Sequence, residues 1–294
     1  MAESRKKVSF YLPWLVLLAG IVFLSFFCFS LVGERNDYRQ EVSVLSEQLE
    51  QLSKEVAANN TLSLAEILKY QALYPDMYCQ PPEDQKIYEN TVYLTFDDGP
   101  SQNTPKVLAI LKKYNIKATF FVTGQGDRKS KAYMKQIVEA GHTIGVHTYS
   151  HQYKAIYTSV ESYLDDFYKI YTLIYEATGV YPEIFRFPGG SVNAYNTGCY
   201  QQIIAEMIRR GFTFYDWNVS ADDATKKSTV YSIIRKATSG IGKSDRLIIL
   251  LHDNGKMERT VKALPQIIDR HKVAGYKFSR LTNDVLPIAF NYID

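Results

Sequence analysis

Two adjacent carboxylates, Asp97 and Asp98, are the first residues whose types and placement could do chemistry. They follow the apolar run 92–94, which is rich in β-branched and aromatic types and predicts a strand. Adjacent like charges repel, so a fold keeps such a pair mainly where a cation or a proton lies between them. Gly99 and Pro100 break the strand, and we expect that turn to bring both carboxylates to one cavity. The alternative is an ordinary polar turn, since these residue types dominate turns.

A second candidate group consists of His147 and His151, which are four residues apart. Imidazoles at this spacing can reach one ion if the turn between them is helical. With Asp98 they would form a three-ligand site with open positions for water and substrate, as in catalytic zinc sites. The same set resembles the two-histidine, one-carboxylate triad of non-haem iron oxygenases, so the ligands alone do not name the metal. The alternative is a pair of solvated or core histidines.

The elements that must position these groups alternate along the chain from Thr91 onward. Strands are predicted at 92–96, 118–122, 143–146, 184–187, 213–217, 247–251 and 276–278, and helices at 104–114, 131–140, 160–177, 195–210, 229–237 and 259–271. Strand–helix alternation with nearly continuous apolar strands predicts an α/β fold with a buried parallel sheet or barrel.

Polar side chains stand at the ends of five of the predicted strands. They are Asp97 and Asp98, His147, Arg186, Asp216 and His252. In parallel barrels the loops at that edge converge over one mouth, which carries the chemistry. We therefore expect these residues to meet.

The amino end predicts a membrane anchor. Basic residues 5–7 precede an uncharged, mostly apolar run over 8–32, and a bilayer core of about 30 Å needs about 20 apolar residues in a helix. No good Ala-x-Ala cleavage site precedes Glu34, so we predict an uncleaved signal anchor. A cleaved signal peptide is the alternative interpretation. The positive-inside tendency places the amino end in the cytoplasm and the bulk of the chain outside the cell membrane.

A helical stalk is predicted after the anchor. Apolar residues recur there at spacings of three and four: Tyr38, Val42, Leu45, Leu49, Leu52 and Val56. The seam spans fewer than three heptads, so a monomeric amphipathic helix and a homodimer both remain open. The predicted organisation is a cytoplasmic tip and transmembrane anchor over 1–33, a stalk and linker over 34–85, and a catalytic domain over 86–294.

Composition excludes some functions. The net charge is +3 and no Lys/Arg stripe with interleaved aromatics occurs, so no nucleic-acid partner is expected. The three cysteines form no Cys-x-x-Cys pattern. Of these, Cys28 lies in the apolar run, and whether Cys79 and Cys199 pair is left open.

Five segments in order carry a family resemblance: 95–100 (TFDDGP), 147–151 (HTYSH), 186–191 (RFPGGS), 216–218 (DWN) and 250–253 (LLHD). They resemble the motifs of the polysaccharide deacetylases of carbohydrate esterase family 4, over about residues 90–290. The resemblance implies a distorted (β/α)7 barrel, one divalent metal that is usually zinc, although cobalt or other ions are possible, and removal of acetyl groups from polymeric sugars. The RFPGGS form resembles membrane-anchored peptidoglycan N-acetylglucosamine deacetylases.

The resemblance also implies catalytic roles. Asp97 would be the general base and Asp98 a metal ligand with the two histidines. Arg186 would pair with Asp97 and orient it. His252 would be the general acid, and Asp216 would stabilise its protonated form.

Binding roles follow in the same way. The backbone N–H of Gly189 would help to hold the oxyanion, although the common family pattern has an aromatic residue at that position. Trp217 and Leu250 would line the pocket for the acetyl methyl group. Apart from the resemblance, the position of Tyr149 near the predicted metal loop would suit stacking on sugars, with core or rim packing as the alternative. Asp222 is an additional acid to which the resemblance assigns no role.

The leading hypothesis is a metal-dependent, membrane-anchored deacetylase of an N-acetylated wall polysaccharide, with peptidoglycan N-acetylglucosamine as the first expectation. Chitin, poly-N-acetylglucosamine and acetylxylan are alternative substrates. A non-catalytic wall-glycan-binding protein and an iron oxygenase with the same ligands are the alternatives from other classes.

Overall fold

The structure, a computed structural model, describes residues 46–47, 50 and 69–291. The chain divides into two compact units, Met1–Lys69 and Tyr70–Asp294. The predicted anchor over 8–32 and the six residues of the predicted heptad seam lie outside the described residues. Among the residues that are described, no helix is both long enough and apolar enough to cross a bilayer.

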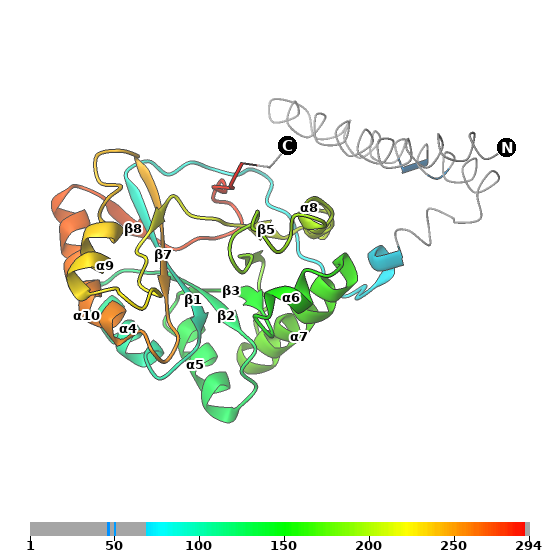
Figure 1. Cartoon of the computed structure of the whole chain (residues 1–294), viewed down its shortest axis with the longest axis horizontal. Coiled ribbons are helices and arrows are strands. Elements are labelled where there is room, and N and C mark those ends of the chain that lie inside the picture. Colours follow the sequence, from blue (N-terminus) through cyan, green and yellow to red (C-terminus); the bar gives the residue numbers. More distant parts are fainter. Residues whose placement is uncertain (1–45, 48–49, 51–68, 292–294) are drawn as a thin grey trace. The chain divides into compact units, whose positions relative to one another are not determined.

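The second unit is built on one parallel sheet (Figure 1). Its strands are β1 (Thr91–Gly99), β2 (Thr119–Thr123), β3 (Thr143–Thr148), β4 (Ile184–Phe185), β5 (Thr213–Phe214), β6 (Val219–Ser220), β7 (Arg246–His252) and β8 (Lys277–Ser279). They are hydrogen-bonded in the order β5-β4-β3-β2-β1-β7-β6, and β8 pairs with β1. All these pairings are parallel. The prediction of a parallel α/β fold is confirmed, but β5 and β6 do not pair with each other, so the described sheet is an open half-barrel.

Helices supply the crossovers that parallel strands require. They are α4 (Thr104–Tyr114), α5 (Arg128–Glu139), α6 (Tyr153–Ile156), α7 (Val160–Thr178), α8 (Tyr200–Arg209), α9 (Val230–Ala237) and α10 (Glu258–Val273), with the 3-10 turn η2 (Lys69–Ala72) before the first strand. Side-chain caps begin several of them: Ser159 accepts the Ser162 N–H at the start of α7, and Asp127 accepts two N–H groups at the start of α5. Figure 1 shows the helices arranged around the sheet.

Two apolar clusters lie on opposite faces of the sheet strands. The larger one, between sheet and helices, includes Leu94 and Phe96 of β1, and the smaller one includes Tyr93. Because side chains alternate along a strand, Thr95 and Asp97 share the face of Tyr93. The first carboxylate therefore lies above the smaller cluster.

A buried arginine holds residues 70–77 within the second unit. Arg210 is fully buried, and its guanidinium donates to the carbonyl groups of Tyr70, Leu73, Tyr74 and Met77. Its Nε also donates to Oε1 of Glu206 at 2.7 Å. The compact unit accordingly begins at Tyr70 and so includes the last residues of the predicted stalk and linker.

The two described cysteines are both free and contact different groups. The Cys79 thiol donates to the carbonyl of Glu183, and the Cys199 thiol donates to the carbonyl of Tyr157. In this structure they do not pair.

The Glu206–Arg210 pair gives a test of stability. The substitution Glu206→Gln leaves a buried guanidinium without its charge partner, so the free energy of unfolding should fall by about 3 kcal/mol. Urea unfolding followed by circular dichroism measures this. In the exposed Lys135–Glu139 pair, Glu139→Gln is the control and should change little. Equal effects of both substitutions on the free energy of unfolding would contradict a stabilising role of the buried Glu206–Arg210 ion pair.

Candidate functional site

A β-bulge at Asp98 brings the paired carboxylates to one side. The register on β2 runs from Asp97 opposite Phe121 directly to Gly99 opposite Val122, so Asp98 is the extra residue. Its φ is +68°. The sequence predicted that Gly99 and Pro100 would end the strand and turn the chain. The strand instead includes Gly99, and the bulge re-aims the second side chain, which regular pleating would point to the opposite face.

Asp98, His147 and His151 form a compact set of possible metal ligands. Oδ1 of Asp98 lies 3.6 Å from Nε2 of His147 and 3.2 Å from Nε2 of His151. The three ligand atoms lie within 4.8 Å of one another. Oδ1 of Asp98 is buried and has no hydrogen-bond partner, as expected of a carboxylate oxygen that binds a cation. The donor set therefore fits a divalent metal ion.

The tautomer of His147 also suits a metal ligand. Its Nδ1 lies 2.9 Å from the backbone oxygen of Arg186, and a carbonyl can only accept, so Nδ1 carries the proton. Nε2 is then free to face Asp98. Burial lowers the pKa of His147 despite the nearby carboxylates, which favours the neutral imidazole that metals bind.

Arg186 is fully buried and holds Asp97 from the side opposite the ligand set. Its Nη1 donates to Oδ1 of Asp97 at 3.0 Å. Its Nε and Nη2 donate to the backbone oxygens of Tyr215 and Asp216 at 2.8 and 3.1 Å. The other oxygen of Asp97, Oδ2, lies 3.7 Å from Nε2 of His147. Asp97 therefore stands beside the possible metal site with one oxygen fixed and one oxygen facing it.

His252 ends β7 directly beside Asp97, and its partner differs from the sequence-based assignment. Asp97 and His252 are register partners on β1 and β7. Nδ1 of His252 lies 2.7 Å from Oδ1 of Asp223, whose Oδ2 also accepts the His252 N–H. Burial lowers the pKa of His252, but the bond and charge of Asp223, together with Asp97 and Asp98, outweigh burial and raise it to about 9.

The assignment of Asp216 as the partner of His252 is therefore wrong. The Asp216 carboxylate accepts the N–H and hydroxyl of Ser191 and the N–H of Phe290. Burial raises its pKa. Asp216 thus ties the 186–191 segment to the C-terminal segment. The sequence contained Asp223 but gave no reason to choose it, because only the pairing of β6 with β7 brings it to His252.

Gly189 is in a conformation that requires glycine. Its φ is +80°, and an added Cβ would lie 2.8 Å from the ring of Tyr153. That ring also meets the imidazole of His151 edge-on, with centroids 5.3 Å apart. Gly189 therefore packs against a ring that also contacts one of the possible metal ligands, and its role as an oxyanion donor stays a prediction.

Trp217 and Leu250 lie near the same mouth. Trp217 is half-buried beneath Phe290, and the Arg186 guanidinium lies 5.6 Å from its ring. Leu250 is two residues before His252 on β7 and shares its face of the strand. Both placements are compatible with a pocket lining.

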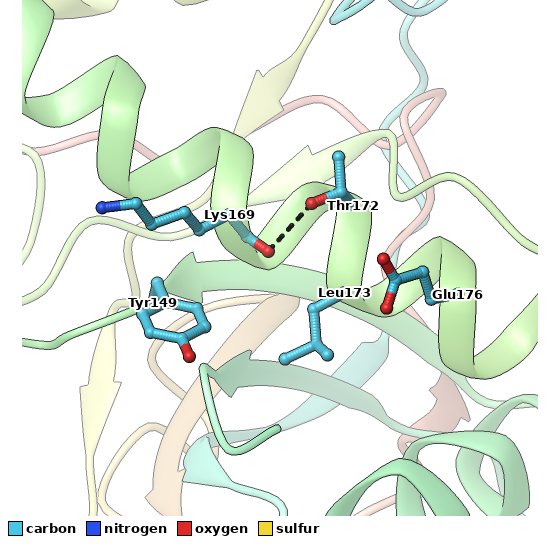
Figure 2. A pocket seen from close by; sticks show the side chains of 5 residues that line it. All are labelled: Tyr149, Lys169, Thr172, Leu173 and Glu176. Atoms are coloured by element: carbon cyan, nitrogen blue, oxygen red, sulfur yellow. Dashed lines mark hydrogen bonds between the residues drawn. The ribbon is translucent and has the colours of Figure 1, made fainter. Parts of the chain in front are cut away.

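Tyr149 and Asp222 point elsewhere. Tyr149 packs over Gly124 and lines a surface pocket with Lys169, Thr172, Leu173 and Glu176 of α7 (Figure 2). No ring contact or hydrogen bond joins its side chain to the possible metal ligands in the described structure, and its sugar-stacking role stays a prediction. Asp222 forms an ion pair with Lys236 and accepts the Ser220 hydroxyl.

Comparisons with known proteins identify relatives. A family model described as polysaccharide deacetylase matches residues 84–212. A peptidoglycan-N-acetylglucosamine deacetylase of Bacillus cereus is 32% identical over 67% of this chain and 87% of its own length. PgdA of Listeria monocytogenes, named a peptidoglycan-N-acetylglucosamine deacetylase, is 33% identical over 72% of this chain, which spans only 43% of that protein.

A solved structure is similar as well. It is the catalytic domain of peptidoglycan N-acetylglucosamine deacetylase from Eubacterium rectale, which is 34% identical. The match covers 72% of this chain and 98% of that one, with a TM-score of 0.67. The likeness therefore extends over the whole of that catalytic domain.

The His252–Asp223 pair predicts a titration. In the metal-free protein, the pKa of His252 should be about 9, and Asp223→Asn should lower it by at least about one unit, because a hydrogen-bonded charge partner is removed. NMR can follow this, since the chain has only five histidines. The control is Asp222→Asn, which should leave the titration unchanged. A shift caused by Asp216→Asn and not by Asp223→Asn would restore the sequence-based assignment.

Proposed function

This chain belongs to the polysaccharide deacetylase family, and from that premise we propose that it hydrolyses the N-acetyl groups of peptidoglycan N-acetylglucosamine and releases acetate. The observation that carries the proposal is the meeting of a possible base, a ligand set and a possible acid at one mouth: Asp97, the Asp98–His147–His151 set, and His252. The peptidoglycan part of the proposal is supported by the names of the relatives.

We assign zinc as the metal ion of this site. Two imidazole nitrogens and one carboxylate oxygen with open positions are a common zinc donor set, and cobalt binds similar ligands. Asp98, His147 and His151 would hold the ion. When bound, a zinc ion supplies Lewis acidity that polarises a carbonyl group and lowers the pKa of water toward about 7.

Asp97 is the proposed base. Its Oδ2 faces the ligand set, so it can accept the proton of a water molecule positioned there. The Arg186 bonds hold the other oxygen and fix the carboxylate rotamer. The Gly189 N–H is the proposed donor to the oxyanion that forms when the water oxygen attacks the acetamide carbon.

His252 is the proposed acid. An amine is a poor leaving group unless it is protonated, so a proton must reach the nitrogen as the C–N bond breaks. With its pKa raised to about 9, His252 carries that proton at neutral pH. Asp223 keeps the proton on Nδ1, which leaves Nε2 to donate.

The proposed chemistry predicts metal dependence and a strict need for Asp97. Asp97→Asn should lower the rate of acetate release by roughly 10²- to 10⁴-fold, the usual contribution of a general base. A chelator should abolish activity, and added Zn²⁺ should restore it. Acetate release from N-acetylglucosamine oligomers and purified peptidoglycan measures both, with Asp127→Asn, at the cap of α5, as the control.

Three outcomes would change the proposal. Full activity of Asp97→Asn would contradict the mechanism, and tight glycan binding without acetate release by zinc-loaded protein would favour a non-catalytic wall-binding protein. Mass spectrometry of products from peptidoglycan, chitin, poly-N-acetylglucosamine and acetylxylan would separate the candidate substrates. Oxygen uptake by iron-loaded protein would instead favour an oxygenase.

We also propose that residues 8–32 anchor the protein in the cell membrane with the catalytic domain outside, and that the stalk is a possible homodimer contact. The support is the length of the uncharged run and the basic residues before it. The full chain should sediment with membranes and be accessible to protease added outside protoplasts. A variant lacking residues 1–33 should stay in the soluble fraction, and an unchanged distribution would contradict the anchor.

A further inference from the structure

The loop between β3 and α6 has an unusual backbone. Thr148 and His151 lie on either side of its two middle residues, Tyr149 and Ser150, and have φ values of +101° and +54°. Non-glycine residues rarely adopt positive φ, and β-branched ones least of all. Such a conformation persists only where surrounding contacts impose it. Because His147 precedes the loop and His151 ends it, the shape of the loop decides whether both imidazoles reach Asp98.

One carboxylate on α7 accepts both N–H groups in the middle of this loop, while the Thr148 hydroxyl accepts the N–H of His151. Oδ1 of Asp166 accepts the N–H of Tyr149 at 2.5 Å and the N–H of Ser150 at 3.2 Å. Its Oδ2 accepts the same Ser150 N–H at 3.1 Å. From the other side, the Gly124 N–H donates to the carbonyl of Tyr149 at 2.9 Å. The peptide groups between the two histidines are therefore held from two directions.

Asp166 lies where an apolar residue would be expected. It is 8% exposed, and its neighbours on the core-facing side of α7 include Tyr163, Phe167 and Ile170, all buried. Burying a carboxylate costs free energy unless it is hydrogen-bonded. No ion pair to Asp166 occurs in the described part of the chain, so the loop N–H groups are what stabilise its charge.

We propose that Asp166 is a positioning residue for the metal site. By accepting the N–H groups of Tyr149 and Ser150, it holds the loop in the conformation in which Nε2 of His147 and Nε2 of His151 both face Asp98. It touches neither substrate nor metal. The inference rests on the metal site of the proposed function and is independent of which glycan is deacetylated.

Zinc affinity of the metal-free full-length protein, measured by competition with a chromophoric chelator, tests this role. Asp166→Asn removes the negative charge that strengthens the bonds to both loop N–H groups and replaces the second acceptor of the Ser150 N–H by an NH₂ group, so zinc should bind about 10- to 100-fold more weakly. Asp166→Glu keeps the charge and should recover part of the affinity. The matched control is Asp165→Asn: Asp165 is the next residue on α7, and it accepts the Tyr74 hydroxyl.

A second measurement separates positioning from a general structural role. The visible absorption of the Co²⁺-loaded protein reports ligand geometry, and it should change in Asp166→Asn and remain unchanged in Asp165→Asn. Zinc affinity within about twofold of wild type together with an unchanged Co²⁺ spectrum would overturn the proposal. Loss of the folded circular dichroism spectrum in both Asp166 variants would also overturn it, because a residue that only positions a loop leaves the remaining fold intact.

The outcomes distinguish this inference from the proposed function. A wild-type protein that binds zinc but releases no acetate would refute deacetylation, while the affinities of the variants would still decide the role of Asp166. Normal acetate release with unaltered zinc binding in Asp166→Asn would do the reverse. A wild-type protein that binds no zinc would overturn both.

Discussion

The ion pair between Arg186 and Asp97 is the interaction on which the rest of the mouth depends. A buried guanidinium is tolerated only when its donors are satisfied. Here they bind the Asp97 carboxylate, the Thr95 hydroxyl, and the backbone carbonyl groups of the two residues after β5, Tyr215 and Asp216. The same group therefore connects β1, β4 and the end of β5. Its planar arrangement of donors fixes the directions of these partners more strictly than a lysine ammonium group could.

The pair also allows two acids to coexist. Asp97 and Asp98 are adjacent, yet they have different partners: Arg186 on one side, and the two histidines on the other. The bulge at Asp98 permits this separation within a single strand. His252, across the register on β7, has its own carboxylate in Asp223. Asp97, Asp98 and His252 thus have different nearest partners, although their charges are coupled, since Asp97 and Asp98 also help to raise the pKa of His252. Pairs of groups whose surroundings differ in this way are what acid–base chemistry uses.

The sequence predicted the alternation of elements well because apolar periodicity reflects burial, and α4 occurs over the predicted residues 104–114. It missed β6 and α6, which span two and four residues and leave little periodic signal. The helix predicted from 195 begins at Tyr200, because the preceding residues form turns. The two omissions and the shifted boundary leave the order of the other elements unchanged.

Most candidate site residues could be found because they follow strands, and parallel strands end at one edge. What could not be predicted depends on pairing between distant segments. Asp223 reaches His252 because β6 pairs with β7, Asp166 on α7 reaches the histidine loop, and the Tyr149 ring packs over Gly124 and beside α7. None of these relations has a fixed spacing in the sequence.

The close approach of Tyr153 to Gly189 limits how this site can be altered. An aromatic side chain at 189, as in the common family pattern, would need both a different backbone conformation and the volume that the Tyr153 ring fills. The side chain that position 189 can carry therefore depends on the side chain at position 153. For protein engineering, Tyr153 and the segment 186–191 would therefore have to be exchanged together.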